Sequence, residues 1–126
     1  MNELKLNDIT GLILEAAFKV HSNLGPGLLE SAYEACLEHE LLKLGLTVNR
    51  QVPIPLIYDG VQLDVGYRLD MLVEGKVIVE LKSVLQMNEI FTAQMISYLR
   101  LSGHKVGLLL NFNVSSLKDG IKRIVN

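Results

Sequence analysis

The chain has 126 residues, a formal net charge of −2, and 49% hydrophobic residues. This length suits one domain, residues 1–126, with a substantial core, and the composition excludes a disordered chain. The charge does not indicate nucleic-acid binding, although a local patch can act where the total charge does not. A single cysteine, Cys36, excludes an intrachain disulfide and a Cys-rich zinc site. No apolar run is long enough to span a membrane, and we expect a cytoplasmic protein.

Two helices are predicted in the first third of the chain. Apolar residues at helical spacing mark the first helix, and Asn7 or Asp8 is its expected cap. This stripe consists of Ile9, Leu12, Ile13, Ala16, Ala17 and Val20. His21 follows near the end of the helix, where we expect it to be solvated or to cap the helix. After a turn with two glycines around a proline, a second helix is predicted over residues 28–44 and is stopped by Gly45.

Three strands are predicted next. They cover residues 47–58, 61–73 and 77–83. Asp59-Gly60 is a strong hairpin turn between the first two strands. Gly66 is expected to mark a bulge or a close approach of another part of the backbone.

The hairpin formed by the second and third of these strands carries charged residues in an apolar setting. A three-residue turn at 74–76 would make Asp70 face Glu80, because opposed residues point to the same face of a hairpin. A two-residue turn would instead place Asp70 opposite Val79, unless a bulge restored the register. The first register is favoured because it gathers the apolar residues of the hairpin on one face. These are Leu69, Met71, Val73, Val77, Val79 and Leu81.

On the opposite face, this register places Arg68, Asp70, Glu80 and Lys82 together. Charges inside a buried strand are costly unless they are paired or bind a metal. Asp70 and Glu80 can hold a divalent cation, and Lys82 can then orient or deprotonate an attacking water. The alternative is a purely structural ion network, which is a poor stabilising device compared with apolar packing.

A third helix is predicted over residues 89–102, with Asn88 as its cap. Gln94 and Tyr98 are four residues apart and share a face of this helix, where they could also be a solvated polar pair. The apolar run 106–112 predicts a strand that is buried on both faces.

At the end of the chain, Ser115 or Ser116 is expected to cap a short helix that reaches about residue 125. The predicted order is therefore α-α-β-β-β-α-β-α. It describes an α/β fold in which a four-stranded mixed sheet is flanked by helices.

The chain resembles the GxxExxY proteins from about residue 9 to residue 125. Gly27, Glu30 and Tyr33 have the spacing of the signature that gives this family its name. The family belongs to the PD-(D/E)xK nuclease superfamily, which implies a restriction-endonuclease-like αβββαβ core.

Two further motifs support this resemblance. Asp70, followed by Glu80-Leu81-Lys82, resembles the D…ExK motif of the superfamily, although Leu69 stands where its name places a proline. Gln94 and Tyr98 resemble the QxxxY motif of RecB-like nucleases.

The resemblance implies a metal-dependent phosphodiesterase site. Its implied ligands for Mg²⁺ or Mn²⁺ are Asp70, Glu80, the Leu81 carbonyl and Glu30, the last directly or through water. Lys82 would position the nucleophilic water and the scissile phosphate. Gln94 and Tyr98 would support Lys82 or touch the nucleic acid. From spacing alone, Glu30 could instead be a favourable charge at a helix N-terminus.

The sequence therefore predicts a small nuclease that acts on DNA. The alternative is a non-catalytic or regulatory module that binds nucleic acid or protein and keeps the nuclease fold. A homodimer is also expected to suit the nuclease, because two sites are needed to cut both strands together.

Overall fold

The computed structural model describes residues 4–126. Its elements are α1 (Leu6–Leu24), α2 (Glu30–Lys43), β1 (Val48–Tyr58), β2 (Val61–Val73), β3 (Val77–Lys82), α3 (Glu89–Ser102), β4 (Val106–Asn111), the 3₁₀ helix η1 (Leu117–Gly120) and β5 (Ile121–Val125). The strands form one sheet in the order β1-β2-β3-β4-β5, in which β3 and β4 are parallel and the other neighbours are antiparallel. This mixed sheet with flanking helices is the predicted α/β, restriction-endonuclease-like architecture.

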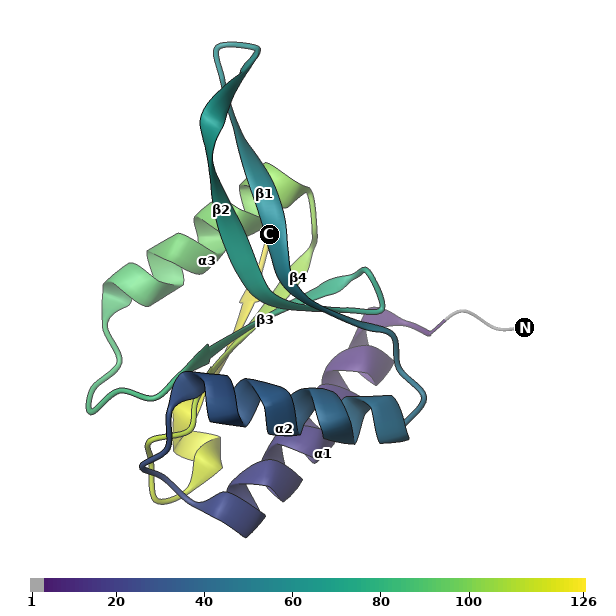
Figure 1. Ribbon diagram of the computed structural model, residues 1–126, viewed down its shortest axis with the longest axis vertical. Coiled ribbons are helices and arrows are strands. Elements are labelled where there is room, and N and C mark those ends of the chain that lie inside the picture. Colours follow the sequence, from purple (N-terminus) through teal and green to yellow (C-terminus); the bar gives the residue numbers. More distant parts are fainter. Residues whose placement is uncertain (1–3) are drawn as a thin grey trace.

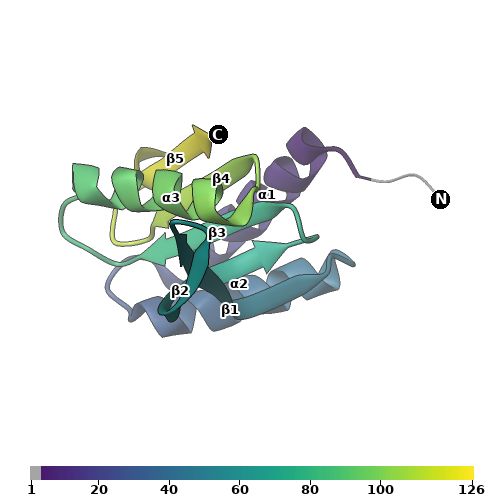
Figure 2. The same ribbon diagram turned by 90° about the horizontal axis from the view of Figure 1, so that it is seen from above.

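Helices cover both faces of the sheet. Helix α3 lies on one face, and α1 and α2 lie on the other (Figures 1 and 2). Val79 and Leu108 pack with α1 and α2, whereas Ile78 and Leu109 pack with α3. Neighbouring residues of β3 and β4 therefore enter different cores. This explains the almost entirely apolar sequence of β4, which was predicted to be buried on both faces, and the apolar run 77–79 of β3.

The register of the β2–β3 hairpin is the predicted one. Met71 pairs with Val79 and Val73 with Val77, around a three-residue turn at 74–76. Leu69 departs from the prediction, because it packs with α3 and not with the other apolar residues of the hairpin. The β2–β3 ladder ends at Met71. Beyond that point β2 pairs only with β1. Its twist can therefore turn Leu69 toward α3, away from the face on which Met71 and Val79 lie.

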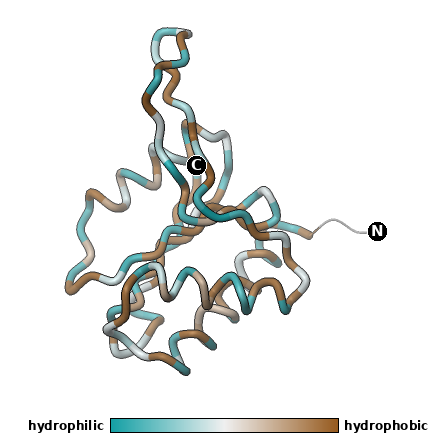
Figure 3. Tube along the Cα trace, viewed as in Figure 1, coloured by the Kyte–Doolittle hydropathy of each residue, from teal (hydrophilic) through white to brown (hydrophobic). Residues whose placement is uncertain are grey.

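The outer part of the β1–β2 hairpin projects from the sheet as an arm, residues 55–66 (Figure 1). Hydrophobic residues continue along it, between hydrophilic ones (Figure 3). The register shifts between Pro55 and Leu56. A Cβ on Gly66 would lie 2.9 Å from the Ile54 carbonyl oxygen. The expected bulge and close approach at Gly66 are both present.

The end of the chain differs from its prediction. Residues 117–120 form only a 3₁₀ turn, and the following segment is a fifth strand, β5, that pairs with β4. Gly120 passes so close to the Asn111 carbonyl oxygen that an added Cβ would collide with it, so this position between η1 and β5 requires glycine. The remaining five residues are too few for their periodicity to distinguish a helix from an edge strand.

Two predictions about α1 also need correction. The helix begins at Leu6, so Asn7 and Asp8 lie in its first turn, and the Asp8 carboxylate accepts a hydrogen bond from the Lys5 amide at 3.3 Å. His21 is buried rather than solvated. Its Nε2 lies 2.8 Å from the Val114 carbonyl oxygen, because the segment after β4 folds back against the end of α1. Within residues 4–126, no helix is both long and apolar enough to cross a membrane.

Candidate active site

Asp70 and Glu80 lie side by side where the β2–β3 ladder ends. The Asp70 amide donates to Glu80 Oε1 at 3.2 Å, and the Leu81 amide donates to Asp70 Oδ2 at 3.0 Å. Each carboxyl group is thus held by the backbone of the opposite strand. The structure brings these two predicted residues together on adjacent strands, as the register requires.

The Glu80 carboxyl group is buried, with 5% of the residue exposed. Burial raises its pKa to about 9, and the hydrogen bond to Asp70 and the charge of Asp70 act in the same direction. The charge of Lys82 lowers this pKa, but not enough to reverse the shift. Two carboxyl groups close enough to share a proton are a suitable donor pair for a hard divalent cation, which would replace that proton.

Glu30 is the first residue of α2 and does not form a group of three acids with this pair. Its Oε1 accepts a hydrogen bond from the Ser83 amide at 3.3 Å, just after β3. Among residues 4–126, no group of three or more His, Cys, Asp or Glu side chains could hold a metal ion. A cation on Asp70 and Glu80 would therefore need further oxygen ligands, such as water and the predicted Leu81 carbonyl.

Tyr33 holds the turn that precedes Glu30. Its buried hydroxyl donates to the Gly25 carbonyl oxygen at 2.6 Å and accepts from the Leu28 amide at 3.1 Å. Its ring stacks on Phe112, with 4.5 Å between the ring centroids. In the sequence, Tyr33 was singled out by its GxxExxY spacing from Gly27 and Glu30. The structure gives it a separate task, which is to anchor the start of α2 to the end of β4.

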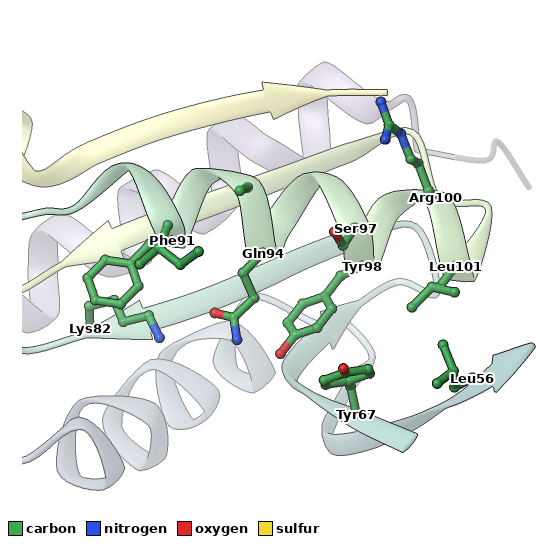
Figure 4. A pocket seen from close by; sticks show the side chains of 11 residues that line it. Leu56, Tyr67, Lys82, Phe91, Gln94, Ser97, Tyr98, Arg100 and Leu101 are labelled. Carbon is green, nitrogen blue, oxygen red and sulfur yellow. The ribbon is translucent and has the colours of Figure 1, made fainter. Parts of the chain in front are cut away.

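Lys82, Gln94 and Tyr98 line one pocket between α3 and β2 (Figure 4). The Lys82 ammonium lies 4.6 Å from the centroid of the Phe91 ring, a cation–π contact. Burial raises the pKa of Tyr98, and the nearby charges of Glu80 and Asp70 raise it further, while a hydrogen bond from Gln94 lowers it. Tyr98 is thus close enough to the carboxyl pair for the charge of that pair to raise its pKa.

The sequence model of the PD-(D/E)XK nuclease superfamily matches residues 7–124. This match covers nearly the whole chain, including both halves of the carboxyl pair. The chain belongs to the PD-(D/E)XK nuclease superfamily. Comparison with curated proteins and with solved structures gave no significant match.

PD-(D/E)XK nucleases generally depend on a divalent metal. The name describes a carboxylate on one strand and an acidic residue with a lysine on the next. Asp70 on β2 and Glu80 with Lys82 on β3 have this arrangement. Their individual roles remain predictions, as do those of Glu30, Gln94 and Tyr98.

Sequence reasoning missed two residues whose hydrogen bonds fix the backbone next to this PD-(D/E)XK site. The Asn111 side chain, which is 2% exposed, accepts from the Val84 amide and donates to the Val84 carbonyl oxygen, both at 3.1 Å. The Ser83 hydroxyl donates to the Leu28 carbonyl oxygen at 2.6 Å. Together they fix the chain directly after Lys82. A polar residue at the end of the otherwise apolar β4 was the available signal for Asn111.

Proposed function

We propose that this protein is a metal-dependent nuclease that hydrolyses DNA phosphodiester bonds at Asp70, Glu80 and Lys82. The observation that carries the proposal is the buried Glu80 carboxyl, which lies against Asp70 and has a pKa raised to about 9. Two adjacent buried carboxylates require a compensating positive charge when they ionise. Groups with strongly shifted pKa values are also concentrated at the functional sites of proteins.

Each residue has a proposed role that follows from its position. Asp70 and Glu80 would bind Mg²⁺ or Mn²⁺ with the Leu81 carbonyl, and Glu30 would act through water from the first turn of α2. When bound, the cation would lower the pKa of a water and offset charge on the phosphoryl oxygens. Lys82 would orient that water and the scissile phosphate. Gln94 would position the hydroxyl of Tyr98, with which it shares a hydrogen bond.

We further propose that the protein is a GxxExxY member of the superfamily with a QxxxY motif on α3. The hydrogen bonds of Tyr33 to Gly25 and Leu28 support the first motif, since they hold the turn that leads into α2. Gln94 and Tyr98 on one face of α3 support the second. A homodimer would allow two such sites to cut both strands, which light scattering of the purified protein would test.

A cleavage assay tests the proposed activity. We expect Mg²⁺- or Mn²⁺-dependent cutting of linear, circular, single-stranded or branched DNA, and its loss in EDTA. Glu80→Gln removes a ligand charge with little change of shape, so we expect cleavage to fall at least about 100-fold. Glu15→Gln, an exposed position on α1, is the matched control and should cut like the wild type.

Retained cutting by Glu80→Gln would contradict the proposed site. The second candidate is a binding module that has lost catalysis. It is favoured by one observation, that the carboxyl pair gains no third acidic or His side chain within residues 4–126. Calorimetry separates the two, because a binding module should show no uptake of Mg²⁺ or Mn²⁺ at millimolar concentration.

A further inference from the structure

A groove of about 670 Å³ runs between α3 and the base of the β1–β2 arm, and Lys82 lies at one end of it. Its walls are mostly apolar. On the α3 side they include Phe91 and Leu101, and on the hairpin side they include Leu56 and Tyr67 (Figure 4). The groove thus begins at a residue of the proposed active site and leads away from it.

Tyr67 is the most exposed of the aromatic side chains that line this groove. It is 44% exposed, whereas Tyr98 beside it is 7% exposed. The two ring centroids are 5.8 Å apart and the rings are tilted by 48°. Tyr98 therefore supports Tyr67 from one side and leaves much of its surface available for a planar ligand.

The charge of the groove suits an anionic strand. The described residues that line it include two cations, Lys82 and Arg100, and no acid. Phe91 and Leu101 are ten residues apart on α3, which corresponds to about 15 Å along the helix axis. This length accommodates about four nucleotides at the 3.4 Å rise of a stacked strand, and fewer of an extended one.

We propose that this groove binds unpaired nucleotides of single-stranded DNA, with a base stacked on Tyr67 and the backbone directed toward Lys82. Stacking on an aromatic side chain requires a base whose face is free, which a paired and stacked duplex does not offer. The polar groups of Gln94, Ser97 and Tyr98 within the apolar walls suit a base edge. This inference rests on the proposed nuclease function, and it identifies single strands or unpaired ends as the substrate.

Equilibrium binding in EDTA tests this proposal without cleavage. A fluorescently labelled single-stranded oligonucleotide and a blunt duplex of the same sequence are titrated with protein, and anisotropy is measured. We expect the single strand to bind more tightly. Tyr67→Ala should weaken its binding about 5- to 150-fold, the range typical for loss of one stacked base. Tyr67→Phe keeps the ring and should retain wild-type affinity.

Tyr58→Ala is the matched control, because Tyr58 is 72% exposed near the tip of the arm and does not line the groove. Its binding should equal that of the wild type. The proposal is overturned if the duplex binds as tightly as the single strand, or if Tyr67→Ala and Tyr58→Ala behave alike. Failure of the wild type to bind any DNA would also overturn it, and would favour a protein ligand for the groove.

The outcomes separate this inference from the proposed activity. A wild type that binds single strands through Tyr67 but never cuts with Mg²⁺ or Mn²⁺ would overturn the nuclease proposal alone. A wild type that cuts DNA with no dependence on Tyr67 would overturn the stacking proposal alone. Thermal melting of each variant monitors the fold, and ultraviolet crosslinking of a bromouracil-containing single strand should label Tyr67 in the wild type.

Discussion

At the scale of single residues, the buried Glu80 carboxyl group lowers the stability of the folded protein when it ionises. It is buried beside Asp70, and its pKa is raised to about 9 by burial and by that neighbour. The folded protein without metal therefore keeps a proton on this group at pH values where the unfolded chain, with a pKa near 4.5, has lost it. Binding sites commonly keep such unfavourable groups at a cost in stability.

The pH dependence of stability follows from this difference. Because the folded state binds more protons than the unfolded state between about pH 4.5 and pH 9, stability should fall as the pH rises through this window. Thermal melting in EDTA at pH 6 and pH 9 measures the effect. Glu80→Gln should melt a few degrees higher than the wild type at pH 9 and show a smaller difference between the two pH values. Equal pH dependence in Glu80→Gln and in the control Glu15→Gln would contradict this account.

Tyr33 makes a second prediction at this scale. Its hydroxyl is buried between the Gly25 carbonyl oxygen and the Leu28 amide, so Tyr33→Phe leaves both groups without this partner. We expect a loss of about 1–3 kcal/mol in the free energy of unfolding, measured by urea denaturation. Tyr58→Phe, at an exposed tyrosine, should lose less than about 0.5 kcal/mol. The expected order of the two variants would be wrong if they lost the same amount.

At the scale of elements, the arm and the sheet have different tasks. Helices on both faces cover β3 and β4, whereas the arm carries exposed side chains such as Ile57 and Val61. Burial of apolar surface is the main source of stability, so the tip of the arm should contribute little to folding. The arm matters instead because its base forms one wall of the groove.

Shortening the arm tests this division. Removing Ile57, Tyr58, Val61 and Gln62 leaves the Asp59-Gly60 turn between Leu56 and Leu63, which already pair. We expect the free energy of unfolding to change by less than about 1 kcal/mol, because the four removed side chains are exposed. Urea denaturation measures it. Loss of a cooperative transition would show that the tip supports the fold after all.

At the scale of the whole molecule, the site depends on contacts between distant parts of the chain. The chain after β3 is held to the start of α2 by Ser83 and to the end of β4 by Asn111. Lys82 is placed between these anchors and α3, where it contacts Phe91. The predicted site residues on α2, β2, β3 and α3 therefore converge at one end of the sheet.

Much of this arrangement could be predicted because local rules agree with the fold. The bounds of β2 and α3 match their prediction, since the Asp59-Gly60 turn and the Asn88 cap are strong local signals. The register that makes Asp70 face Glu80 followed from the alternation of apolar residues. The end of the chain was predicted wrongly, because β5 exists through its pairing with β4 rather than through its own pattern.

The sequence by itself determined the α/β class, the β2–β3 hairpin and the pairing of its two carboxylates, because periodicity and turn residues act over a few positions. The nuclease-like core followed from the resemblance of its motifs to the PD-(D/E)xK superfamily. Only the tertiary structure decided that Leu69 leaves the face of its neighbours, that His21 is buried, and that Tyr67 lies beside Tyr98 at the wall of a groove. These features depend on twist and on packing between segments far apart in the chain. No local pattern in the sequence records such contacts.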